Sequence, residues 1–271
     1  KKAEKLEEVK GLKIYMGKTT GTLLVDDEEA ILKHLKNFKK TVVFHAEDEK
    51  TVEVMEKEKM KRWPAGIVGI SKACALGKIT GARVHIAHAT SYEEVILAKI
   101  LGATVETAPH YLFLDESAMK KWGGVNPPLR ERAEMERLWK CIGKIDCIAT
   151  DHAPHTKKEK KDGAKGYPGL ETSLSLMLTA YNKGMITLRE IEEKMARKPA
   201  AIFGLNRIGK IKEGFVGDLT VVDLNKEWEV DGERLNTKVR WSPFEGMRLK
   251  GKVKAVIKEG RLIYHDGNFL T

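Results

Sequence analysis

Four polar residues stand inside or directly after short apolar segments: Lys13, His45, His88 and Asp151. A single histidine in such a segment is more often a hydrogen-bonded core residue than a ligand, and a single lysine more often extends its amine to solvent. Four such positions in four separate segments favour a shared site. Imidazole and carboxylate groups suit zinc, which supplies hydroxide at neutral pH when one coordination position stays open for water. A buried amine is costly when charged, and carboxylation would turn it into an anionic ligand able to bridge two metals.

The apolar segments alternate with stretches of helical period. The strand-like segments are residues 11–16, 41–45, 83–88, 103–107 and 145–150. The helix-like stretches between and after them are residues 27–37, 49–61, 67–76, 92–101 and 132–142. Repeated β-α units predict an α/β fold with a parallel sheet or barrel. In a β/α barrel, catalytic groups come from the carboxyl ends of several strands, where these four residues fall.

The pattern changes towards the end of the chain. Two further helices are predicted at residues 171–183 and 188–195. After about residue 205, short β-like segments follow at 218–224, 253–257 and 261–264, the last two flanking a Lys-Glu-Gly turn. These segments predict a separate small sheet.

The composition excludes several classes of protein. The 271 residues are 42% hydrophobic and 32% charged, with a net charge of +10 and a pI of about 9.3. Lysine and glutamate interleave along helical stretches and no nucleic-acid motif is present, so we interpret the charge as a solvated surface. The three cysteines have no paired spacing and indicate a reducing compartment. No apolar run is long enough to cross a membrane and residues 1–10 contain no signal-peptide core, so we expect a cytoplasmic protein.

Several longer motifs carry a family resemblance. They are GLKIYM (11–16), FHAE (44–47), VHIAH (84–88), ETAPHYLF (106–113), VNPPLR (125–130), IDCIATDHAPH (145–155), GYPGLET (166–172) and WSPFEG (241–246). Through them the chain resembles the amidohydrolase superfamily and, within it, the dihydroorotase family, including the dihydroorotase domain of the animal multifunctional pyrimidine-synthesis protein. The resemblance implies a (β/α)8 barrel over residues 1–205, with strands four to eight visible here, and part of a small β-sandwich domain over residues 206–271.

The resemblance also implies roles for the four polar residues. Lys13 would be carboxylated and bridge two zinc ions, and His45 and His88 would bind the second, more exposed zinc. Asp151 would bind the first zinc and act as general base and acid, passing a proton from the attacking water to the ring nitrogen.

Further residues are assigned to the substrate by the same resemblance. Asn126 would contact the pyrimidine ring, and His155 would hydrogen-bond the substrate carboxylate. Pro168 and Gly169 would contact the ring through backbone groups. The implied activity is the reversible hydrolysis of (S)-dihydroorotate to N-carbamoyl-L-aspartate in the synthesis of UMP. Aspartate transcarbamoylase is the implied protein partner, with neither nucleic acid nor membrane.

Other polar residues receive weaker expectations. Thr19 and Thr20 resemble a loop that closes on substrate in some dihydroorotases. The odd spacing between His85 and His88 predicts that His85 faces the other side of its strand. We expect His110 to contact the metal-binding residues without binding the metal itself, and His152 to be structural.

One part of the family pattern is absent from the sequence. Dihydroorotases carry a His-x-His pair at the end of the first barrel strand, then an Arg and an Asn that grip the substrate, and no His-x-His occurs here. We therefore expect the natural protein to contain a further N-terminal portion, without which the first zinc lacks two ligands. The segment KRWPAG (61–66) also departs from the family's Arg-Pro-x-x-Ala-Glu pattern.

Two alternatives stay open at this point. Allantoinase and hydantoinase (dihydropyrimidinase) share the lysine, the histidines and the aspartate, although Lys13 in its GLKIY context and His155 favour dihydroorotase. An inactive homologue that assembles with aspartate transcarbamoylase is the second alternative. The four metal ligands present out of the expected six argue against it.

Overall fold

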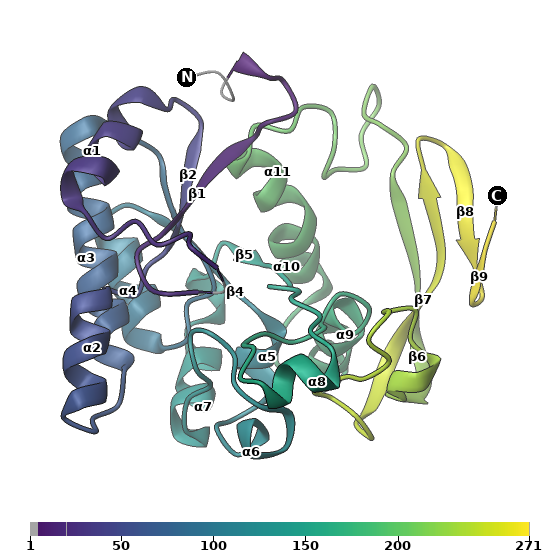
Figure 1. Ribbon diagram of the computed structural model, residues 1–271. Coiled ribbons are helices and arrows are strands. Elements are labelled where there is room, and N and C mark those ends of the chain that lie inside the picture. The colour runs from purple at the N-terminus through teal and green to yellow at the C-terminus, as the bar shows by residue number, and fades with distance from the viewer. Residues whose placement is uncertain (1–4, 20, 271) are drawn as a thin grey trace.

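The computed structural model describes residues 5–19 and 21–270, which contain a parallel and an antiparallel sheet. The parallel sheet has five strands in the order β1-β2-β3-β4-β5, so each strand pairs with the one that follows it in the chain (Figure 1). Its strands are β1 (Gly11–Tyr15), β2 (Thr41–His45), β3 (Val84–Ile86), β4 (Thr104–Thr107) and β5 (Cys147–Ile148). This sequential parallel order is that of consecutive β/α units.

Helices connect and cover these strands. The first group is α1 (Glu28–Asn37), α2 (Glu49–Lys57), α3 (Trp63–Thr80), α4 (Tyr92–Ile100), α5 (Pro109–Phe113), α6 (Ala118–Trp122) and α7 (Arg132–Lys140), followed by the 3₁₀ turn η2 (Ile142–Lys144). The second group is α8 (Lys157–Lys161), α9 (Ser173–Asn182), α10 (Leu188–Glu192), the π-helical turn η3 (Glu193–Arg197) and α11 (Lys198–Ile202). In Figure 1, α1, α2, α3 and α4 form a layer on one side of the parallel strands.

Local sequence explains where several helices begin and end. Asp27, Asp48 and Ser91 each accept a hydrogen bond from a backbone N–H in the first turn of the helix that follows. Helix α2 ends before the predicted residue 61, since Lys59 has a φ of 53°. Helix α3 ends at Gly81, which adopts the left-handed conformation that a glycine tolerates at no steric cost.

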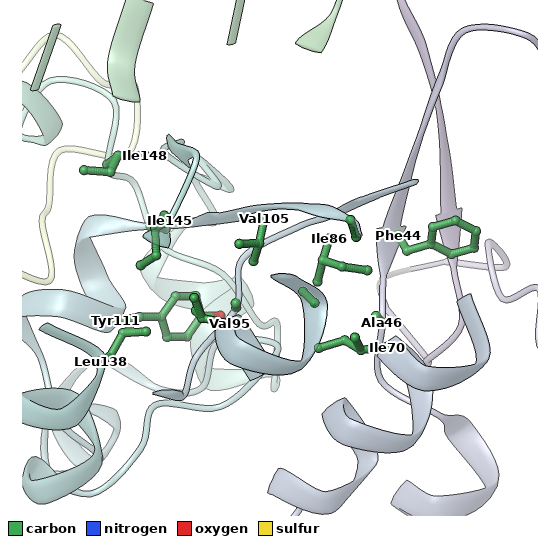
Figure 2. Close-up of a cluster of buried hydrophobic side chains, with 14 of the residues drawn as sticks. Phe44, Ala46, Ile70, Ile86, Val95, Val105, Tyr111, Leu138, Ile145 and Ile148 are labelled. Carbon is green, nitrogen blue, oxygen red and sulfur yellow. The ribbon is translucent and has the colours of Figure 1, made fainter. Parts of the chain in front are cut away.

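Alternation along the strands separates the core from the site. Ile14, Phe44, Ile86 and Val105 are buried in one hydrophobic core (Figure 2 shows part of it). Side chains one position away point to the opposite face of the sheet, and Lys13 is among them. The apolar face therefore fixes the strands, and the other face is free to carry polar groups.

The antiparallel sheet lies at the C-terminal end of the chain. It consists of β6 (Leu219–Glu229), β7 (Arg248–Lys258), β8 (Arg261–His265) and β9 (Asn268–Phe269) in that order, with the 3₁₀ turn η4 (Gly232–Arg234) between the first two. Helix α9 packs on β7 so closely that a Cβ at Gly251 would lie 2.4 Å from Cβ of Leu178. The glycine thereby permits the contact between the two parts of the chain.

The predicted α/β class is confirmed, and all five parallel strands occur where the sequence predicts them, β3 and β5 being shorter. The sequence did not indicate α5, α6, α8, α11 and β9, which have two to five residues each. The C-terminal strands form a single four-stranded sheet within the described residues. Within residues 5–19 and 21–270, no helix has both the length and the apolar character needed to cross a membrane.

Candidate active site

The predicted ligands meet at the carboxyl edge of the parallel sheet. Tyr15 pairs with His45 at the ends of β1 and β2, and Lys13 pairs with Val43 two positions earlier on the same face. Because parallel strands present their carboxyl ends at one edge, side chains from successive β/α units converge there. His88 and Asp151 follow the ends of β3 and β5 by two and three residues.

His45 and His88 form the tightest pair of the site. Nδ1 of His45 lies 2.9 Å from Nε2 of His88, and the ring centroids are 4.6 Å apart at 66°. Both side chains are buried, at 2% and 5% exposure. Burial and the nearby charge of Lys13 hold the pKa of His88 well below its ordinary value. The His88 imidazole is therefore neutral, the state in which a ring nitrogen can bind a metal.

Two of the predicted ligands have an uncommon backbone conformation. His88 has a φ of 41° and Asp151 a φ of 45°. Few non-glycine residues have a positive φ, and such residues concentrate at functional sites when the surrounding structure imposes them. The turn after each strand re-aims the side chain, so strand alternation does not predict its direction.

Lys13 and Asp151 influence each other electrostatically. Burial lowers the pKa of Lys13, and the negative charges of Glu106 and Asp151 oppose this shift. Burial also raises the pKa of Asp151, which Lys13 and His45 counteract. The Asp151 side chain keeps 34% of its surface exposed, so it can reach a bound molecule.

Two further histidines support this face. Nε2 of His110 lies 4.0 Å from a carboxylate oxygen of Asp151, and burial lowers the pKa of His110 to about 3. His85 contacts Oγ1 of Thr104 at 2.8 Å and a carboxylate oxygen of Glu106 at 3.1 Å. The expectation that His85 faces away from the site is wrong. The strand register places it beside Val43 and thus on the face of Lys13, since alternation stops at the turn before His88.

Asn126 and His155 both line one pocket of the structure. This pocket has a volume of about 540 Å³ and is lined by Lys18, Thr19, Asn126, His155, Glu159, Asp162, Gly163, Ala164 and Lys165. Nδ2 of Asn126 donates to the backbone oxygen of Lys18 at 2.7 Å, while its Oδ1 is buried without a hydrogen-bond partner. A second pocket, of about 400 Å³, includes Arg62 and Arg130 but none of the predicted site residues.

The remaining predicted substrate residues lie beside the Asp151 turn. Pro168 is buried, and the backbone N–H of Gly169 donates to Nδ1 of His152 at 3.1 Å. A Cβ at Gly169 would lie 3.3 Å from the backbone oxygen of Thr150. The contact gives His152 the structural role expected for it. Thr20, the second residue of the predicted loop, lies outside the described residues, and Thr19 lines the larger pocket.

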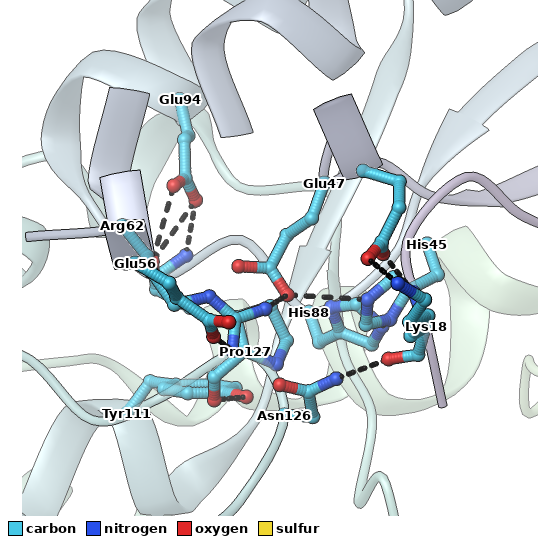
Figure 3. Close-up of polar contacts among 12 residues, drawn as sticks. Lys18, His45, Glu47, Glu56, Arg62, His88, Glu94, Tyr111, Asn126 and Pro127 are labelled. Carbon is cyan, nitrogen blue, oxygen red and sulfur yellow. Dashed lines mark hydrogen bonds and ion pairs between the residues drawn. The ribbon is translucent and has the colours of Figure 1, made fainter. Parts of the chain in front are cut away.

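Two buried glutamates form ion pairs that the sequence did not indicate, and Figure 3 shows Glu47 with His45 and Arg62. Glu47 lies 3.2 Å from Nε2 of His45 and 3.3 Å from Nη2 of Arg62. Burial would raise the pKa of Glu47, but its interactions with His45 and then Arg62 outweigh that effect and lower it. Arg130 pairs with Glu94 at 3.1 Å. In sequence, a glutamate in the FHAE motif and one in the first turn of α4 resemble surface residues, and only their burial identifies them.

The donor groups fit a zinc ion. The facing nitrogens, Nδ1 of His45 and Nε2 of His88, contact each other at 2.9 Å, and Nε2 of His110 is buried without a hydrogen-bond partner. Two nitrogens bound to one tetrahedral zinc lie about 3.3 Å apart, close to the 2.9 Å between His45 and His88. Among the described residues, no three His, Cys, Asp or Glu side chains form a complete metal cluster. The fourth candidate ligand, Lys13, belongs to none of those residue types.

A parallel β/α sheet with imidazole, carboxylate and amine groups at its carboxyl edge has the arrangement of β/α enzymes. The model of the amidohydrolase family matches residues 4–263, and the chain belongs to this family.

The chain is also similar in sequence to individual proteins of known function. A dihydroorotase of Pyrococcus horikoshii is 37% identical over 268 residues, which are 95% of this chain and 61% of that protein. The multifunctional protein CAD of Squalus acanthias is 33% identical, over 96% of this chain and 11% of that protein. The chain thus spans less than two thirds of these relatives.

Solved structures share the fold. An L-hydantoinase (dihydropyrimidinase) of Arthrobacter aurescens has a TM-score of 0.89 and 26% identity, over 97% of this chain and 66% of that one. A dihydropyrimidinase of Brevibacillus agri NCHU1002 has the same TM-score at 24% identity, over 98% and 66% of the two chains, and is similar in fold.

Proposed function

We propose that this protein is a zinc-dependent hydrolase of cyclic amides that interconverts (S)-dihydroorotate and N-carbamoyl-L-aspartate. The observation that carries the proposal is the facing pair of buried imidazoles, His45 and His88, at the sheet edge that also holds Asp151 and Lys13. Similarity to dihydroorotases at 37% identity supports the choice of substrate over other cyclic amides.

His45 and His88 would hold one zinc ion through Nδ1 and Nε2, the two nitrogens that face each other. Lys13, in carboxylated form, and Asp151 would complete a two-metal site. Zinc in such a site makes bound water acidic and polarises the amide carbonyl. The lowered pKa of Lys13, a consequence of burial, supports carboxylation, because carbon dioxide reacts with a neutral amine.

Asp151 would move the proton of the reaction. Its raised pKa brings the carboxyl closer to the working pH, which suits a group that accepts a proton from water and donates it to the leaving ring nitrogen. The nearby His110 stays neutral, so it adds no positive charge that would oppose protonation of Asp151.

The pocket beside this edge would hold the substrate. Asn126 has a buried oxygen without a hydrogen-bond partner that can accept from a ring N–H, and His155, which lines the same pocket, can donate to a carboxylate. Pro168 and Gly169 would close the pocket beside Asp151 with backbone groups. Together these contacts would orient the scissile amide over the imidazole pair.

The finer architecture is also a proposal. The sequential order of the parallel strands supports their being part of an eight-stranded barrel, with residues 1–205 as its domain. The antiparallel sheet would be part of a β-sandwich formed by residues 206–271. Association with aspartate transcarbamoylase stays a prediction, which co-purification of the two proteins would test.

Turnover measurements test the function. The protein, purified with zinc and bicarbonate, should hydrolyse (S)-dihydroorotate in preference to allantoin and 5,6-dihydrouracil. Preference for 5,6-dihydrouracil would instead support a dihydropyrimidinase, the class of the similar solved structures. No turnover of any of the three substrates by a zinc-loaded protein would overturn the proposal.

A further inference from the structure

Glu47 is a buried carboxylate that the proposed chemistry does not use. Only 2% of its side chain is exposed, and it lies two residues beyond His45. Its Oε2 faces two cationic or hydrogen-donating groups, Nε2 of His45 at 3.2 Å and Nη2 of Arg62 at 3.3 Å (Figure 3). A buried carboxylate destabilises the fold unless it is paired. The two groups that pair with Glu47 are therefore the place to look for its role.

Helix α3 and the residue before it hold the segment that carries Glu47. Arg62 is the residue before α3, and its side chain is 14% exposed. The backbone of α3 approaches so closely that a Cβ at Gly69 would lie 2.3 Å from the backbone oxygen of Ala46, and the N–H of Asp48 donates to the oxygen of Ala65 at 3.0 Å. These contacts fix the segment that carries Glu47 against the first part of α3.

The arrangement determines which nitrogen of His45 carries the proton. A neutral imidazole has one N–H and one lone pair, and a carboxylate can only accept. With Glu47 at Nε2, the proton belongs on Nε2 and the lone pair on Nδ1, the atom that faces His88. The contact is an ion-pair distance of 3.2 Å, and the N–H of Nε2 does not point directly at Oε2.

We infer that Glu47 is a positioning residue, which fixes the proton of His45 at Nε2 and presents the Nδ1 lone pair to a metal, while Arg62 holds the carboxylate in place. The inference rests on the proposed function, since it takes His45 as a metal ligand. Carboxylates that hold a metal-binding histidine in this way typically contribute about tenfold to hundredfold in metal affinity.

The test compares Glu47→Leu, which removes the acceptor, with Asp146→Leu. Asp146 is also a buried carboxylate, 9% exposed and 2.7 Å from Nζ of Lys99, but it lies among none of the proposed ligands. Two quantities are measured on the purified protein: zinc affinity by competition with a chelating dye, and the His45 tautomer in the metal-free protein by ¹⁵N NMR of the imidazole rings.

We expect wild type and Asp146→Leu to share the Nε2–H tautomer of His45 and the same zinc affinity, although Asp146→Leu is less stable. Glu47→Leu should lose that tautomer as the dominant form and bind zinc about tenfold to hundredfold more weakly. An Nδ1–H tautomer in wild type, or an unchanged tautomer and affinity in Glu47→Leu, overturns the inference.

Two further outcomes are separable. If Glu47→Leu does not fold, Glu47→Gln decides. It should shift the His45 Nε2 resonance and weaken zinc binding at least about threefold, because an amide oxygen is a weaker acceptor than a carboxylate, and unchanged values count against the inference. If wild type binds no zinc, the proposed function fails, whereas the tautomer still decides the role of Glu47.

Discussion

Nδ1 of His45 and Nε2 of His88 lie 2.9 Å apart, although 43 residues separate them in the chain. The parallel pairing of β2 with β3 produces this contact, since it brings the carboxyl ends of both strands to one edge of the sheet. The outer nitrogen of His45, Nε2, faces the carboxylate of Glu47 at 3.2 Å, and the outer nitrogen of His88, Nδ1, is buried without a hydrogen-bond partner.

Removing either imidazole should abolish tight zinc binding at this edge. We expect His88→Ala to lower the metal content of the purified protein by at least one zinc per chain, because a single remaining imidazole is a weak ligand set. The measurement is elemental analysis after dialysis. His34→Ala, at an exposed position of α1, is the control and should keep the wild-type content. Equal content in both variants would contradict the assignment.

Asp151→Asn should leave the fold intact and remove turnover. The amide keeps the shape of the side chain but cannot accept a proton, and general acid–base catalysis typically contributes about 10²–10⁴-fold in rate. The side chain is one third exposed, at 34%, so the thermal unfolding midpoint should change little. Steady-state hydrolysis of dihydroorotate measures the loss. Activity near wild type would exclude Asp151 as the proton carrier.

The glycine in the middle of α3 should be intolerant of substitution. Gly69→Ala places a methyl group 2.3 Å from the backbone oxygen of Ala46, and overpacking of this kind typically costs about 1–3 kcal/mol of unfolding free energy. Gly143→Ala is the matched control, because nothing lies within 4 Å of its added methyl group. Urea unfolding of both variants gives the comparison, and equal stability would refute the tight contact between α3 and the His45 segment.

Lys160 provides a pH-dependent contribution to stability. Its amine donates to the backbone oxygens of Gly124 and Gly166, and burial lowers its pKa from 10.5 to about 8. Between pH 8 and 10.5 the unfolded chain therefore binds more protons than the folded one at this site, so unfolding free energy rises with pH over that window. Below pH 8 both states are protonated, and the folded state carries the full cost of burying the charge.

Comparison with Lys160→Met isolates this contribution from the other groups that titrate. The difference in unfolding free energy, wild type minus variant, should increase by roughly 1 kcal/mol between pH 7.5 and 10, a figure reduced for solvent screening because the side chain is only partly buried. Denaturant unfolding at several pH values measures it. A difference that stays constant with pH would show that the amine is not desolvated.

The sequence predicts the elements near the site well because their signals are local. Apolar runs of about five residues followed by helical periods identify all five parallel strands. The family resemblance implies substrate roles for Asn126 and His155, and both residues line one pocket of the fold. Helix α8 has five residues, little more than one turn, so no helical period develops in it, and β9 has only two residues, both exposed.

The sequence by itself determined the residue types and the β/α alternation, because side-chain periodicity is a property of neighbouring residues. The tertiary structure alone decided which groups meet. His88 and Asp151 have positive φ values and so depart from strand geometry. His85 lies on the same face of the sheet as Lys13, and Glu47 is buried between His45 and Arg62. Strand pairing and helix packing create these arrangements, and no local sequence pattern encodes them.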